Sequence, residues 1–303
     1  MVKQKTFEWS LERGDLLPLL LMLPTLLVIL FVMVFPLVYG LLLSFFTIGF
    51  GGRISLDSFV GLDNYLQFFN DPVAKKATLN TVLFSFGAIA GDFILGTLVS
   101  LGLLKLRRSA SSLIRPIVTM PLLVSPVVVG LIWRYIYDPK GILYYFLGKI
   151  GLGISNFPGV TAASTSLIST IIAHWWQVTP FVIIVLTAGL LAIPEEYYEA
   201  SKIDGAGPFR TFFQITLPQL MNVYIVIMLV SGVDTIKIFD LIFALTGGGP
   251  NNSSISLSIY AYSQAFEQSN LSYSIAISIL TMLLTFCIFG IPFIKHNLSK
   301  GNR

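Results

Sequence analysis

The side chains that could do chemistry lie on two apolar stretches of the sequence. In the first stretch, residues at the helical spacings i, i+3, i+4 and i+7 form one face, which consists of His174, Gln177, Val178 and Phe181. The imidazole and the amide can hydrogen-bond hydroxyl groups, and the phenyl ring can cover an apolar ring face. The pattern therefore permits contact with a substrate. The alternative is ordinary packing, in which His174 makes a hydrogen bond between helices.

A second face follows about sixty residues later and consists of Ser231, Asp234, Thr235 and Ile238. Lys237 lies three residues from both Asp234 and Asp240, so it can pair with either carboxylate on a helix. Because a local ion pair offsets the cost of placing charges among apolar groups, we expect Asp234, Lys237 and Asp240 to serve mainly structure.

The sequence holds too few reactive groups for a membrane enzyme. Its two histidines, His174 and His296, are far apart, and Cys287 is the single cysteine. A lone cysteine excludes an internal disulfide and a cysteine-based metal cluster, and we expect no metal site. No G-x-x-x-x-G-K-[ST] phosphate loop is present, so any ATP that drives this protein must be bound by another chain.

Composition places both polar faces inside a membrane. Of the 303 residues, 55% are hydrophobic and only 11% are charged, against about 25% charged in a soluble domain. A helix needs roughly 20 mostly apolar residues to cross the bilayer core. Six segments qualify: 16–46, 79–104, 114–136, 167–192, 219–246 and 271–294. We predict an all-α integral membrane protein with six transmembrane helices in one domain, residues 1–303.

The distribution of Lys and Arg predicts the orientation of these helices. Basic residues gather in cytoplasmic segments. With the amino terminus inside, the inner segments hold Lys3, Lys5, Arg13, Lys105, Arg107, Arg108, Arg115, Lys202, Arg210, Lys295, Lys300 and Arg303. The outer segments hold only Arg53, Lys75, Lys76, Arg134, Lys140 and Lys149. The bias predicts that both termini are cytoplasmic. The stretch 63–69 is expected to form a short helix at the outer interface.

The inner segment 193–218 carries the strongest motif. Pro194 ends the fourth span, Glu195 and Glu196 suit the first turn of a helix, and we predict a helix over 195–204. Gly205 and Gly207 then permit a sharp turn. A stiff helix tied to two spans can carry motion between a cytosolic partner and the membrane. A merely solvated charged loop is the alternative.

Glu-Ala-Ser at 199–201, Gly205, and Ile-Thr-Leu-Pro at 215–218 resemble the EAA motif of binding-protein-dependent ABC importer permeases. Ser201 replaces the usual Ala. Further stretches resemble the carbohydrate branch of that family, namely 61–65, 126–133, 245–250, 260–262 and 265–266.

The resemblance implies the type I importer (MetI-like) core, a second homologous permease subunit, and two ATPase subunits that bind ATP and Mg. It also implies an extracytoplasmic solute-binding protein, a prokaryotic cytoplasmic membrane, no cofactor in this chain and no nucleic-acid partner. The residues implied to couple to the ATPase are Glu199, Ala200, Ser201, Asp204, Gly205 and Gly207.

The resemblance also implies which residues contact substrate. An ungapped count from 193–194 and from 217–218 reaches stretches that line the cavity in permeases of the maltose importer type. The implied contacts are His174, Gln177, Val178, Phe181, Ser231, Thr235 and Ile238. The implied substrate is a monosaccharide, an oligosaccharide or a polyol.

An ion-coupled secondary transporter, with Asp92, Asp234, Asp240 and His174 as a relay, is the rival interpretation. We find no inverted repeat to support it.

Overall fold

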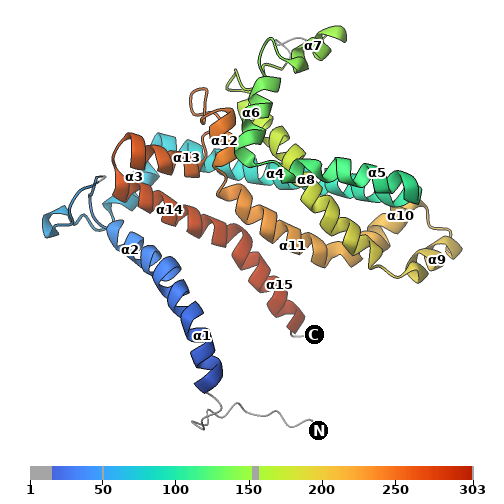
Figure 1. The fold of residues 1–303 in the computed structure, drawn as a ribbon, viewed down its shortest axis with the longest axis horizontal. Helices are drawn as coiled ribbons and strands as arrows, with labels where there is room; N and C mark the ends of the chain where they lie inside the picture. Colours follow the sequence, from blue (N-terminus) through green and yellow to red (C-terminus); the bar gives the residue numbers. More distant parts are fainter. Residues whose placement is uncertain (1–15, 50, 152–156, 302–303) are drawn as a thin grey trace.

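The computed structural model describes residues 16–49, 51–151 and 157–301, and this part of the chain is helical apart from turns and two isolated β-bridges. Five helices are long and apolar enough to cross a membrane, or six if one sharply bent pair counts as a span. The prediction of several helices long and apolar enough to cross a membrane is therefore confirmed. Figure 1 shows α4, α8 and α11 running side by side, with α9 and α10 at one end.

The spans are assembled from elements with the following bounds. The first contains α1 (Leu16–Val28), the π-helical η1 (Ile29–Val34) and α2 (Phe35–Leu43). Single helices form the second, α4 (Pro72–Lys105), and the fourth, α8 (Ser166–Leu191). The fifth contains α10 (Pro208–Thr211), η4 (Phe212–Thr216) and α11 (Leu217–Ile236). The last contains α14 (Leu271–Thr285), η6 (Phe286–Gly290) and α15 (Ile291–Gly301).

The main internal interface of the molecule lies between α4 and α8, and we call it the α4–α8 seam. Small residues on α4 let the two backbones approach closely. A Cβ on Gly91 would lie 2.0 Å from the Trp175 ring, and one on Gly96 would lie 2.5 Å from Val182. The Trp175 indole N–H donates to the carbonyls of Gly87 and Ala88, at 3.1 Å each. Close packing and buried hydrogen bonds thus fix α8 against α4.

The start of α4 is fixed by Asp71, whose carboxylate caps the helix by accepting from the Val73 and Ala74 backbone amides. The hydroxyls of Tyr260, on α13 (Leu257–Tyr262), and Tyr273 donate to the same carboxylate. Partial burial opposes ionisation, but these hydrogen bonds outweigh it and hold the pKa of Asp71 below its usual value. Asp71 therefore ties three helices together at this end.

The third predicted segment, 114–136, is wrong as a single helix. It consists of α5 (Arg108–Thr119), the short η3 (Met120–Leu123) and α6 (Pro126–Ile136), and the two halves meet at 101°. Pro126 disfavours the helical conformation for the residue before it, and Ser125 is extended at ψ 140°. The bend directs α6 along α12 (Asp240–Leu245).

The fifth predicted segment, 219–246, is also wrong at both ends, since the span begins at Pro208 and ends at Ile236. Residues 237–239 are not helical, and a separate short helix, α12, follows. The break is stabilised by Ser256, whose hydroxyl donates to the Ile238 carbonyl at 3.0 Å. Hydropathy alone could not reveal this break because both helices are apolar.

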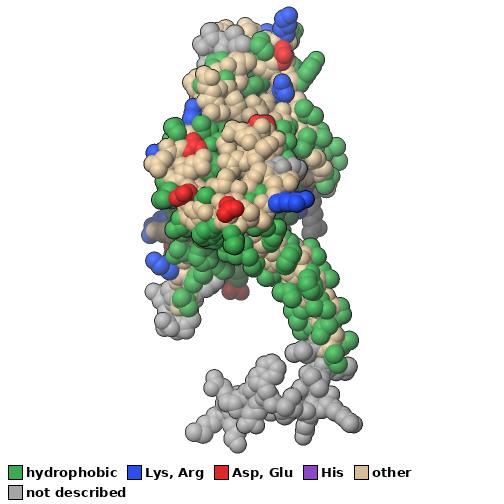
Figure 2. Space-filling view, turned by 90° about the vertical axis from the view of Figure 1, so that its left-hand side faces the viewer, with side chains coloured by type: hydrophobic (Ala, Val, Ile, Leu, Met, Phe, Trp, Pro, Cys, Tyr) green, Lys and Arg blue, Asp and Glu red, His purple; other side chains and the backbone are tan. Residues whose placement is uncertain are grey.

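The first span packs least within the chain. Only 6% of its most apolar window is buried, against 56% for α8. Figure 2 shows it as a column of hydrophobic side chains that leaves the rest of the molecule. Near its end Ser44 and Asn64 are buried, and Asn64, on α3 (Asp63–Asn70), donates to the carbonyls of Ser44 and Phe46. The short helix predicted over 63–69 is thus confirmed as α3.

Candidate functional site: the coupling segment and the polar core

The helix predicted within residues 193–218 is present as α9 (Glu195–Ile203), which ends one residue earlier than expected. Glu199, Ala200 and Asp204 are exposed. Ser201 is the buried exception, and its hydroxyl lies 2.6 Å from that of Thr211 on α10. We call residues 193–218, which contain α9, α10 and η4, the coupling segment. The acidic residues of this segment are exposed, while Ser201 on the opposite side of α9 hydrogen-bonds α10.

The two glycines of the coupling segment differ in conformation. Gly205 has φ +67°, a region that residues with a Cβ adopt at a cost. Gly207 is extended, with φ −71° and ψ 168°, and precedes α10. A Cβ on either glycine would meet nothing within 4 Å in this chain. The sharp turn therefore needs glycine at position 205, where φ is positive. Position 207 has an ordinary extended backbone, so its conformation does not require glycine.

The polar residues of the predicted substrate face lie in the core of the chain. His174 is 5% exposed, and its Nε2 lies 3.2 Å from an oxygen of Asp92 on α4. The Thr179 hydroxyl donates to the other oxygen of Asp92 at 3.0 Å. Gln177 is 8% exposed and donates to the Val124 carbonyl at 3.0 Å. The helix–helix hydrogen bond that was the packing alternative for His174 is thus present.

The residues of the second predicted face also differ in burial. Thr235 is fully buried and hydrogen-bonds Ser85 of α4, and Ser231 is buried on the same helix. Val178, Phe181 and Ile238 are only partly buried. The structure therefore brings His174 and Thr235 against α4 and Gln177 against the Val124 carbonyl, while Asp234 stays exposed.

The Asp92 pairing is the contact that reasoning from sequence missed. Asp92 and His174 are 82 residues apart, so no local spacing joins them. The available signal was one carboxylate and one imidazole, each in the middle of a different apolar span. Ionisable groups at such depth usually pair with one another.

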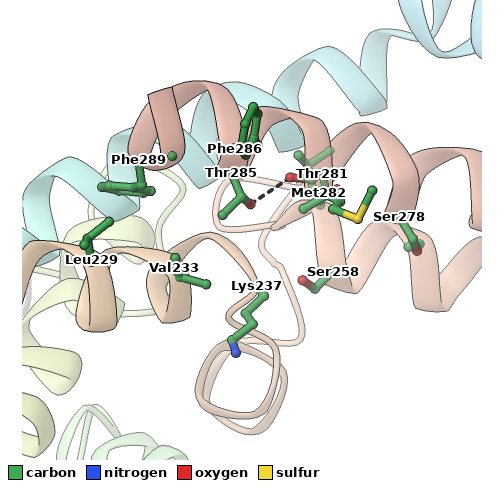
Figure 3. Close-up of a pocket in the computed structure, with 13 residues that line it drawn as sticks. Leu229, Val233, Lys237, Ser258, Ser278, Thr281, Met282, Thr285, Phe286 and Phe289 are labelled. Atoms are coloured by element: carbon green, nitrogen blue, oxygen red, sulfur yellow. Dashed lines mark hydrogen bonds between the residues drawn. The ribbon is translucent and has the colours of Figure 1, made fainter. Parts of the chain in front are cut away.

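The three charged residues Asp234, Lys237 and Asp240 are more exposed than the polar residues described above. Lys237 Nζ lies 2.9 Å from an oxygen of Asp234, and both side chains are more than half exposed within this chain. Asp240 begins α12 and is exposed, and the described residues give it no salt bridge. Lys237 also borders a cavity of about 560 Å³ between α11, α13 and α14, whose other lining is mainly apolar (Figure 3).

The two adjacent tryptophans of α8 have different surroundings, which the sequence could not assign. Trp175 is partly buried and hydrogen-bonds α4. Trp176 is 40% exposed and packs edge-on against Trp133 of α6. Among the described residues, no group of three or more His, Cys, Asp or Glu side chains could hold a metal ion.

Comparison with known families decides what this arrangement belongs to. The family described as binding-protein-dependent transport system inner membrane component matches residues 84–293, which include the α4–α8 seam and the coupling segment. The chain belongs to this family. The family predicted from the EAA-like motif is thus confirmed, and the ion-coupled alternative is not supported.

Curated relatives cover most of the chain. The trehalose/maltose transport system permease protein MalF of Thermococcus litoralis is 35% identical over 78% of this chain and 79% of its own length. The sn-glycerol-3-phosphate transport system permease protein UgpA of Pectobacterium atrosepticum is 31% identical over 93% of this chain and 94% of its own length.

A solved structure shares the fold over nearly the whole chain. It is a bacterial ABC transporter involved in the import of the acidic polysaccharide alginate, and its matching chain has a TM-score of 0.80 at 21% identity. The match covers 95% of this chain and 96% of that one. The arrangement of helices around the α4–α8 seam is therefore that of a known ABC permease fold.

Proposed function

We propose that this chain is the substrate-translocating permease subunit of an ATP-driven importer, and that its substrate is a monosaccharide, an oligosaccharide or a polyol. The family match over residues 84–293 carries the proposal, because it contains both the bundle and the coupling segment. The relatives that support the substrate class are named for trehalose and maltose, glycerol 3-phosphate, and sulfoquinovosyl glycerol.

The proposed complex contains a second permease subunit, two ATPase subunits that bind ATP and Mg, and an extracytoplasmic solute-binding protein. A related alginate transporter has been solved with its periplasmic protein bound. In this chain the exposed acidic face of α9 suits a basic cleft on an ATPase, with Glu199 as an acceptor. Gly205 provides the turn that returns the chain to the membrane.

We place the protein in a prokaryotic cytoplasmic membrane with both termini in the cytoplasm. The charge bias that supports this includes Lys3, Lys5, Arg13 and Arg303, which lie outside the described residues. Single cysteines at the exposed positions Ser55, Ser112 and Asn251 test it after Cys287 is replaced. An impermeant maleimide should label Ser112→Cys from inside only, and the other two from outside only. The reverse pattern would contradict the orientation.

The proposed substrate contacts remain His174, Gln177, Val178, Phe181, Ser231, Thr235 and Ile238. The internal hydrogen bonds of the polar members mean that a sugar hydroxyl would have to replace one of those bonds, at about 1–3 kcal/mol for each group left unpaired. Thr235→Leu should therefore disrupt the packing of α11 against α4, because Thr235 is fully buried. Any loss of uptake in this variant would then follow from the loss of packing and not from a blocked substrate path.

Uptake by the reconstituted complex tests the function. Vesicles that contain this chain, its partner permease and the ATPases, with ATP inside and the binding protein outside, should accumulate one or more radiolabelled sugars from a panel. Phe181→Leu, which keeps an apolar side chain against the buried cluster of Val182, Leu186 and Ile227, should raise the half-saturation constant while the yield of complex stays unchanged. Uptake that continues without ATP, or that follows an ion gradient, would contradict the proposal.

A further inference from the structure

A continuous groove runs along one side of the bundle and ends beneath the coupling segment. One hollow, of about 580 Å³, lies between the last turns of α4, helix α9 and the α10–η4 segment. A second, of about 460 Å³, continues between α4 and α11. The two hollows share Thr97, Leu98 and Phe212, so they form one path. Both volumes fall in the range of small-molecule sites.

The part of the groove between α4 and α11 offers a ligand no hydrogen bond. Its lining is apolar except for two hydroxyl groups. Those of Thr97 and Tyr224 lie 2.6 Å apart and bond each other, and Thr97 also donates to the Phe93 carbonyl. A sugar or a nucleotide would lose its hydration there without compensation. A hydrocarbon chain would lose none.

The end beneath the coupling segment carries charge of one sign. Lys105 and Lys202 are the charged residues that line the groove, and neither has a salt bridge within the described part of the chain. Each lies in the last turn of its helix, where a cation also favours the helix dipole. The dipole explains each lysine separately. It does not explain why two segments that are far apart in sequence each contribute a lysine to the lining of one apolar groove.

We infer that the groove binds an anionic glycerophospholipid such as phosphatidylglycerol. Its phosphate lies between Lys105 and Lys202, and one acyl chain follows α4 past Leu98 toward α11. Charge complementarity selects the headgroup, and the apolar lining accepts the chain. Since Tyr198, Ser201 and Lys202 of α9 form one wall, the bound lipid holds the coupling segment against the end of α4. This role is separate from substrate transport.

Photo-crosslinking tests the inference. The full chain, with the subunits that purify with it, is reconstituted in phosphatidylcholine vesicles doped with either a photoactivatable phosphatidylglycerol or the matching phosphatidylcholine. Peptide mapping should place phosphatidylglycerol on 94–105 and 198–213, well above the choline analogue. Removing each lysine should lower that labelling about fivefold. The matched controls are Lys75→Ala and Lys140→Ala, each of which removes one charge from an exposed position outside the groove and should change nothing.

Three outcomes would overturn the inference. Equal labelling by both lipids would show that the groove has no headgroup preference. Full competition by inorganic phosphate would assign the lysines to a free anion. Absence of phosphatidylglycerol labelling on these peptides, with labelling on a second permease subunit instead, would show that protein fills the groove. The comparison of two lipids on the unmodified chain decides the matter even if a lysine variant folds poorly.

Discussion

The α4–α8 seam and the coupling segment both depend on glycine, but for different reasons. In the seam, Gly91 is required because the Trp175 ring occupies the space of a side chain, 2.0 Å from where a Cβ would lie. In the coupling segment, Gly205 has open space on all sides and is required for its positive φ. Gly91 allows two helices of the chain to pack closely, and Gly205 allows the backbone to turn.

The surroundings of the two regions agree with this difference. The seam holds buried partners for its polar groups, such as Asp92 with His174 and Thr179. The acidic residues of α9 face outward and form no salt bridge in the described chain. Changes in the seam should therefore alter the stability of this chain, while changes in the coupling segment should alter communication with a partner.

The largest effect is expected from His174→Ala. It removes a buried ring and leaves the buried Asp92 carboxyl group without its imidazole hydrogen bond, which together cost about 3–5 kcal/mol. Reversible unfolding of the purified chain in mixed micelles measures the loss. Adding Asp92→Asn to the same variant should restore part of the stability, because it replaces the buried carboxyl group that has lost its partner. A double variant no more stable than His174→Ala would contradict the pairing of Asp92 with His174.

The next effect is expected from Gly91→Ala. The new methyl group overlaps the Trp175 ring, and overpacking of this kind costs about 1–3 kcal/mol. Gly102→Ala is the matched control on the same helix, since a Cβ there meets nothing within 4 Å, and it should be neutral or slightly stabilising. The same unfolding measurement compares the two. Equal stabilities would mean that α4 and α8 do not approach as closely as described.

A smaller effect separates the two glycines of the coupling segment. Gly205→Ala places a Cβ at φ +67°, which costs about 1–2 kcal/mol, whereas Gly207→Ala keeps an ordinary extended backbone. Hydrogen exchange of the α9 amides should speed up about tenfold in the first variant and stay unchanged in the second. Global unfolding should change little in either. Equal exchange in the two variants would count against the turn described here.

The smallest effect is expected from Ser201→Ala, which restores the residue usual in the EAA motif. It removes a hydrogen bond to Thr211, worth about 0.5–1.5 kcal/mol. Hydrogen exchange in α9 and α10 should rise slightly, and Thr211→Val should produce a similar rise. If combining the two substitutions gave the sum of their separate effects, the bond would not stabilise the segment.

Local rules predicted much of the coupling segment and of the spans. Helix α9, the turn at Gly205, α3 and the bounds of α8 follow from charges, glycine conformation and apolar length. These features depend on neighbours in the sequence.

The features that the sequence did not predict depend on contacts between distant residues. The break after Ile236 is stabilised by Ser256, and the pairing of Asp92 joins two separate spans. The 101° bend between α5 and α6 had a local signal in Pro126, but apolar length masked it. Helical periodicity grouped the polar residues of α8 and α11, but it could not show that His174 and Thr235 contact α4 while Asp234 stays exposed.

The most direct test of the account is the stimulation of ATP hydrolysis by sugar-loaded binding protein in complexes that carry Gly205→Asp. This substitution adds a charge and a strained backbone to the turn after α9, and leaves the seam untouched. We predict normal yield, an unchanged unfolding midpoint and unchanged basal hydrolysis, but loss of both stimulation and uptake. Normal stimulation in this variant would contradict the central claim that the coupling segment connects this permease to its ATPase.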